Sequence, residues 1–168
     1  MRKILIILFI IFVVMFQIGV ISQIKLQAGK LDLILLVIIA LVLINKIDLQ
    51  DSLLIGLTAS FIIGLVSAEP FVFVIFFYLS ATMFVYYIRS RVWKIPLITM
   101  FFSVAVVTIL HHLIFGLFLI FEGANFGFSE LLQSVLMPSL MLNIFAVIPV
   151  YFLVLEVWQW FSPIEEEE

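Results

Sequence analysis

The sequence predicts an all-α integral membrane protein, built as a single bundle of six transmembrane helices. Of its 168 residues, 66% are apolar, whereas only 8 are Lys or Arg and 11 are Asp or Glu. Soluble domains carry about 25% charged residues, so this chain has too few polar side chains to cover a water-facing surface. Charges and Pro or Gly clusters also divide it into six apolar runs, and a helix needs roughly 20 apolar residues to cross a bilayer.

Composition also excludes several classes of protein. A formal net charge of -3 provides no basic surface for nucleic acid. The absence of cysteine excludes disulfides, thiolate metal sites and a cysteine nucleophile. A mean hydropathy of +1.40 indicates that lipid is the solvent for most of the chain.

The six predicted spans are separated by short polar links and cover 4–22, 31–44, 53–68, 71–88, 95–121 and 131–161. They are apolar all round, as expected of helices surrounded by lipid, and lack the alternation of a β-barrel. The sixth span is long and contains Pro138 and Pro149, which predicts a kink or an interfacial start. The first run is too long for a signal peptide and lacks a small-x-small cleavage site, so we expect it to be retained. We therefore expect one transmembrane domain over 1–164 and an acidic tail over 165–168.

Basic residues predict the orientation, because cytoplasmic loops are enriched in Lys and Arg. With the N-terminus in the cytoplasm, only Lys25 and Lys30 fall on the outer side. The inner side then receives Arg2, Lys3, Lys46, Arg89, Arg91 and Lys94. Six spans also place the tail 165–168 in the cytoplasm, where it either meets a basic partner or, as we favour, is solvated.

Few ionisable residues lie within the predicted spans, and each is a candidate site because such residues are costly in lipid. His111 and His112 are either a proton relay or ligand site or, as we favour, neutral imidazoles bonded to another helix. A metal site is not expected, because it needs at least three ligands at suitable spacing. We expect Glu156 to pair with Arg89 or Arg91, or to reach the interface, rather than to serve transport. His111, His112 and Glu156 are together the candidate residues of a polar pocket.

Other polar and small residues point to helix packing or to a partner. Asp32 opens the second span and is expected to cap that helix, to contact a partner, or both. Gly56, Ser60 and Gly64 are spaced four residues apart and form a stripe that another helix can approach closely. We favour packing within the chain over a dimer face. Asn143 is expected to bond to backbone freed by a proline or to another helix, with a ligand contact as the alternative.

No catalytic set is evident in the sequence. Thr108 and His111 lie one helical turn apart, but no orienting acid is near them in sequence. A Gly-rich phosphate loop, paired catalytic carboxylates and a zinc-protease helix motif are all absent. We therefore expect no enzymatic activity and no cofactor.

Three stretches carry a family resemblance. The second span begins with Leu31 and Asp32, the stretch 56–70 has small residues four apart and ends in Pro70, and the last span contains Asn143, Pro149 and Tyr151. These stretches resemble the bacterial rod shape-determining protein MreD family. The chain departs from the family pattern where Leu31 replaces a proline, Ser60 replaces a glycine and Gly64 replaces an acid.

The resemblance implies a non-enzymatic scaffold of the cell-elongation complex in the bacterial inner membrane. It implies binding to an MreC-like protein and, through it, to the MreB filament and to the cell-wall synthase RodA with its transpeptidase. The family's arrangement is also similar to the S-components of energy-coupling factor transporters. The alternative function is therefore a membrane carrier of a small, largely apolar ligand, which would need a pocket with convergent polar groups. The outer ends of the spans offer Asp32, Glu69, Glu122, Asn125 and His111 or His112.

Overall fold

The computed structural model describes residues 2–23, 25–26, 28–44, 48–89, 95–124 and 127–161. The long helices are α1 (Arg2–Gly19), α2 (Leu33–Ile44), α3 (Leu49–Val66), α4 (Phe71–Arg89), α5 (Pro96–Phe121) and α7 (Met137–Phe161). The short elements are the 3-10 turn η1 (Ile21–Gln23), the strands β1 (Lys25–Leu26) and β2 (Gly29–Lys30), α6 (Phe128–Glu130) and the π-helical segment η2 (Leu131–Leu136). Lys46, Arg91, Lys94, Asn125 and the tail 165–168 lie outside the described residues.

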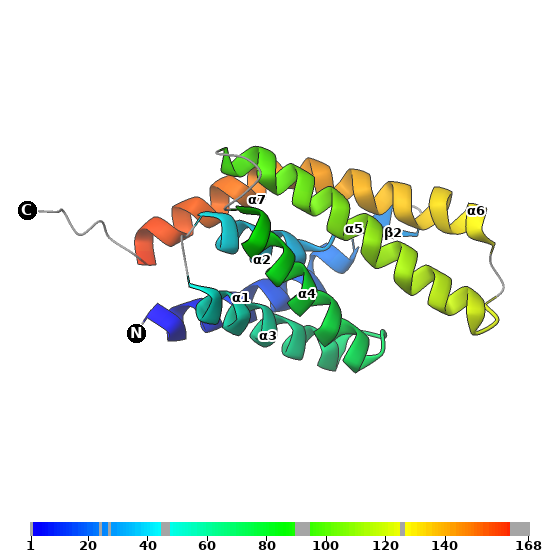
Figure 1. Cartoon of the computed structure of the whole chain (residues 1–168), viewed down its shortest axis with the longest axis horizontal. Helices are drawn as coiled ribbons and strands as arrows, with labels where there is room; N and C mark the ends of the chain where they lie inside the picture. The colour runs from blue at the N-terminus through cyan, green and yellow to red at the C-terminus, as the bar shows by residue number, and fades with distance from the viewer. Residues whose placement is uncertain are drawn as a thin grey trace, which may run out of the picture.

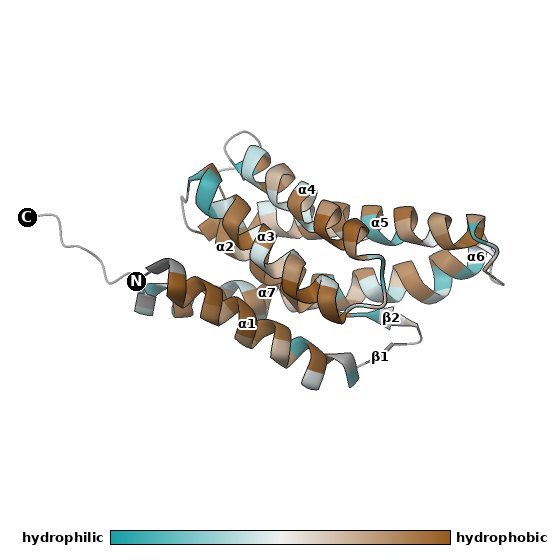
Figure 2. Cartoon of the chain, turned by 90° about the horizontal axis from the view of Figure 1, so that it is seen from below, coloured by the Kyte–Doolittle hydropathy of each residue, from teal (hydrophilic) through white to brown (hydrophobic). Residues whose placement is uncertain are grey.

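Within the described residues, four helices are long and apolar enough to cross a membrane. They are Leu49–Val66, Phe71–Arg89, Pro96–Phe121 and the continuous stretch Phe128–Trp160. Ile4–Gly19 and Leu33–Ile44 are apolar but shorter. Most residues of the long helices are apolar (Figure 2), and many of their large apolar side chains are exposed, so the chain is an all-α protein embedded in a membrane.

Helix α2 forms the centre of the bundle, and its residues 34–43 are all buried. It contacts α1, α3, α4, α5 and α7, with α5 and α7 side by side along one flank and α1 and α3 along the other (Figure 1). Its all-round apolarity predicted lipid on every side, but in the structure neighbouring helices surround it. A helix of 12 residues is only about 18 Å long, and protein contacts on every side remove the need to match the bilayer thickness.

The polar link before α2 contains a feature that the sequence did not predict. It is a two-stranded antiparallel ribbon with two residues in each strand. Lys25 pairs with Lys30 and Leu26 pairs with Gly29. The ribbon packs on the start of α7, where the Lys30 N–H donates to Ser139 Oγ at 3.0 Å. A Cβ on Gly29 would lie 2.7 Å from the backbone nitrogen of Ser139, so only glycine fits this approach.

The last helix deviates from regular α geometry where it meets this ribbon. Pro138 has no N–H to give to the Ser134 carbonyl at α-helical spacing. That carbonyl instead accepts the N–H of Ala28 at 3.2 Å. A π-helical segment over Leu131–Leu136 lies just before Pro138, while Pro149 lies inside α7.

The helices alternate in direction, so that α1 begins and α7 ends at the same end of the bundle (Figure 1). The ribbon, the link between α3 and α4 and the end of α5 lie toward the opposite end (Figure 1). The candidate site lies toward that opposite end.

Candidate binding pocket

A pocket of about 470 Å³ lies among the polar residues that converge toward this end. That volume is within the range of small-molecule sites. Its lining comes from the ends of α1 and α3, the turn η1, the strand β2, the start of α2, the link between α3 and α4, and the helices α4, α5 and α7. The polar lining residues are Gln17, Gln23, Lys30, Asp32, Ser67, Glu69, Tyr78, Thr108, His111, His112 and Asn143.

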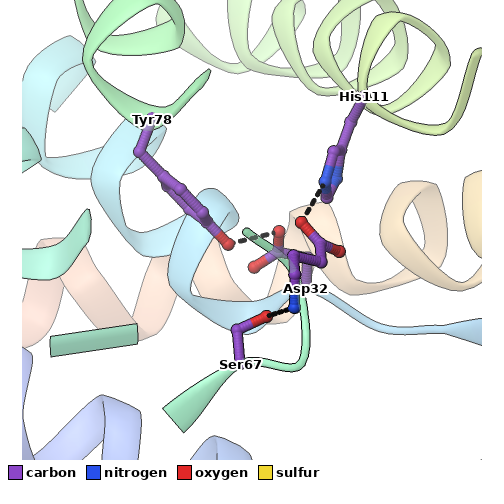
Figure 3. A network of polar contacts seen from close by, with 5 residues as sticks. Asp32, Ser67, Tyr78 and His111 are labelled. Atoms are coloured by element: carbon purple, nitrogen blue, oxygen red, sulfur yellow. Dashed lines mark hydrogen bonds and ion pairs between the residues drawn. The ribbon is translucent and has the colours of Figure 1, made fainter. Parts of the chain in front are cut away.

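Asp32 is the N-cap of α2, as its position at the start of the predicted span indicated. Its Oδ1 accepts the N–H of Leu35, the third residue of the helix, at 2.9 Å. Its Oδ2 accepts the Tyr78 hydroxyl at 2.8 Å (Figure 3). The cap satisfies a free N–H of the first helical turn, and the tyrosine ties α2 to α4.

Asn143 joins the same cluster from α7 and is only 1% exposed. Its Oδ1 accepts the backbone N–H of Asp32 at 2.8 Å, and its Nδ2 donates to Thr108 Oγ1 at 3.0 Å. The amide thus bridges the start of α2 and the middle of α5, which is the contact to other helices that the sequence suggested. Buried amides are costly unless paired, and here both ends of the amide are used.

The carboxylate that pairs with His111 comes from a distant part of the sequence. Its Nε2 lies 3.1 Å from Oε2 of Glu69 in the link between α3 and α4 (Figure 3). The Glu69 N–H in turn donates to Ser67 Oγ at 3.1 Å. The imidazole stacks on Phe77, with ring centroids 4.2 Å apart. The ring of His112 is also stacked on it, 5.2 Å away, so the two histidines form a stacked pair that lines the pocket.

Gln17 and Tyr78 belong to the site although sequence reasoning did not select them. Gln17 Nε2 donates to the Leu31 carbonyl at 2.7 Å, and its Oε1 accepts the Leu33 N–H at 2.9 Å. Both residues did leave a signal, because each places a polar atom inside an otherwise apolar run. Tyr78 also lies in the middle of its helix, whereas tyrosines of membrane proteins concentrate at the interfaces.

The small-residue stripe is not part of the pocket. Gly56, Ser60 and Gly64 are buried, and α3 packs against α4 along them. A Cβ on Gly56 would lie 2.5 Å from Thr82 Oγ1, and one on Gly64 would lie 2.8 Å from the Phe71 ring. The stripe is therefore covered within the chain, in agreement with the packing interpretation and not with a face left free for a partner.

Glu156 does not belong with the histidines either. It is exposed near the end of α7, in the last turns before Phe161 and away from the pocket. Arg89, one of its expected partners, donates from Nη1 to the Val42 carbonyl at 2.9 Å and lies over the Tyr86 ring. The other, Arg91, lies outside the described residues.

The arrangement can bind, orient and exchange protons with a small polar group. Two carboxylates, two imidazoles and three side-chain amides reach one cavity from segments far apart in the sequence. Apolar lining residues such as Ile18, Ile63 and Val74 supply the remaining wall.

Comparisons of this chain with models of protein families, with curated proteins and with solved structures found no match.

Proposed function

We propose that this chain is a non-enzymatic scaffold of the bacterial cell-elongation complex. It docks an MreC-like bitopic protein and, through it, links the MreB filament to RodA and its transpeptidase. It crosses the inner membrane six times, with both termini in the cytoplasm, so that α1 and α2 count as spans together with the four longer helices.

The observation that carries this proposal is the contact between Asp32 and Asn143. These two positions carry the family resemblance in the second and last spans, and they lie 111 residues apart. The Asp32 N–H donates to the Asn143 side chain at 2.8 Å. The third stretch of the resemblance, 56–70, packs against α4 and brings Glu69 to the same pocket. Residues that a shared pattern singles out are thus joined in one site, which supports a common architecture.

The alternation of helix direction supports the six-span topology. Arg89 lies at the end of α4 that is remote from the pocket, whereas Lys30 lines the pocket. This separation matches the expected excess of basic residues on the cytoplasmic side. The pocket then opens toward the outer side of the membrane.

Affinity purification from native membranes tests the scaffold. The tagged chain is extracted in mild detergent, and co-purifying proteins are quantified by mass spectrometry against an unrelated multi-pass protein expressed at the same level. We expect enrichment of an MreC-like protein, and rounding of rod-shaped cells when the chain is depleted. Failure to enrich such a protein, together with unchanged cell shape on depletion, would refute the proposal.

The pocket favours a second candidate, a membrane binder or carrier of a small ligand. Its polar lining indicates a ligand with polar groups in place of the largely apolar ligand suggested by the sequence. Mass spectrometry of small molecules retained by the purified chain tests this candidate. A stoichiometric ligand, with a transporter ATPase and without a morphogenesis protein, would replace the scaffold proposal with the carrier.

A further inference from the structure

The pocket contains two carboxylates whose hydrogen-bonding capacity is not used up. A carboxylate can accept about four hydrogen bonds. Asp32 accepts one on each oxygen, from Leu35 and from Tyr78. Glu69 pairs through Oε2 with His111, and its Oε1 has no hydrogen-bond partner among the described residues. The Glu69 side chain is 25% exposed, so it remains accessible from the cavity.

The lining combines carboxylates with apolar side chains. Ile18 of α1 and Ile63 and Val66 of α3 form one apolar part of the wall, and Leu35 of α2 and Val74 of α4 add to it. The carboxylates come from the start of α2 and from the link between α3 and α4. A ligand that fills this cavity therefore meets both carboxylates and aliphatic side chains.

Charge selects the polar end of that ligand. Lys30 lines the pocket but is an exposed residue, so water screens its ammonium group more than it screens the half-buried acids. His111 already faces Glu69. An anion would meet two carboxylates, whereas a cation would form charge-assisted hydrogen bonds, which are stronger than neutral ones.

We propose that the pocket binds an alkylammonium group, with its nitrogen at Glu69 and Asp32 and its aliphatic part against α1 and α3. This inference rests on the pocket being a binding site, as in the second candidate function, and it names the ligand chemistry. The group can come from two sources, a free aliphatic amine or the lysine side chain of a docked partner. The second source is compatible with the scaffold.

The first experiment measures binding of n-hexylammonium chloride to the full chain in lipid nanodiscs. The readout is the midpoint of thermal unfolding. Because a ligand of the folded state raises the unfolding midpoint, n-hexylammonium should raise it in a saturable manner. Equal concentrations of n-hexanol and of sodium hexanoate control for partition into lipid and for charge. Equal shifts with n-hexanol, or a larger shift with hexanoate, would overturn the proposal.

The second experiment uses a matched pair of variants. Glu69→Gln should weaken n-hexylammonium binding by about tenfold or more, because it removes one partner of a charge-assisted bond. Glu122→Gln is the control, since Glu122 is an exposed acid that follows α5 and does not line the pocket. Unchanged affinity in Glu69→Gln would overturn the proposal. If that variant does not fold, the selectivity of the unmodified chain for the ammonium over the alcohol decides.

Carbodiimide coupling in native membranes distinguishes the two sources, because it joins a carboxylate to a neighbouring amine as an amide. A small amine attached at Glu69 identifies a free ligand, and a peptide attached through its lysine identifies a partner. Neither product at Glu69, in a sample where Glu122 is labelled by an added amine, counts against the proposal. The scaffold proposal would survive that result if the MreC-like protein still co-purifies, so the two failures can be told apart.

Discussion

Replacing Asn143 by alanine tests the polar cluster at the centre of the site. The substitution leaves the Asp32 N–H without its acceptor in a partly buried position and the Thr108 hydroxyl without its donor in a buried one. An unsatisfied buried polar group costs about 1–3 kcal/mol, whereas hydrogen bonds between membrane helices average about 0.6 kcal/mol. We therefore expect Asn143→Ala to lower the free energy of unfolding by about 1–3 kcal/mol.

Unfolding of the purified chain in mixed detergent micelles measures this loss. Thermal unfolding should show a midpoint lower by about 2–4 °C for each kcal/mol in a chain of this size. Gln159→Ala is the matched control, because Gln159 is an exposed amide on the same helix. An exposed substitution of that kind is expected to change stability by less than about 0.5 kcal/mol.

A double-mutant cycle isolates the bond itself. Thr108→Val removes the hydroxyl that accepts from Asn143, and the combined variant should lose less than the sum of the two single losses by at least about 0.5 kcal/mol. If Asn143→Ala is as stable as the Gln159→Ala control, or if the two losses simply add, the reasoning from buried, paired amide groups is refuted.

Three further substitutions probe the close packing of helices and the Asp32 carboxylate that caps α2. Gly56→Ala should cost about 1–3 kcal/mol, because its Cβ would lie 2.5 Å from a side-chain oxygen of α4, whereas Gly19→Ala meets nothing within 4 Å and should cost nothing; detergent unfolding compares the two. Gly29→Ala should loosen the ribbon from α7, since its Cβ would lie 2.7 Å from backbone; faster amide hydrogen exchange in β2 would show this, and unchanged exchange would argue against it. Tyr78→Phe should cost about 1 kcal/mol or more, because it removes the donor to Asp32 at 2.8 Å; an unchanged unfolding midpoint would contradict that bond.

Hydropathy located the helices well where their ends coincide with local chain signals. The predicted span 71–88 is α4 (Phe71–Arg89), and 95–121 is α5 (Pro96–Phe121). Prolines and charges at these ends act on the chain locally, so they can be recognised without tertiary information.

Hydropathy failed where a helix continues into polar sequence. The predicted span 53–68 is α3, which runs from Leu49 to Val66 and includes Asp51 in its first turn. An acid is favourable at a helix N-terminus although it is unfavourable in lipid. Hydropathy therefore marks the apolar segment and not the helix.

The sequence alone determined that the chain is a membrane protein, which polar residues lie within its apolar segments, and that Asp32 can cap a helix. Composition and N-cap chemistry act locally, so they need no tertiary information. Which polar residues meet was decided by the tertiary structure. Glu69 lies 42 residues from His111, and Asp32 lies 46 from Tyr78. Helices that are apolar all round carry no signal for their rotation about their own axes. Only their packing around α2 turned Tyr78, His111 and Asn143 toward one cavity.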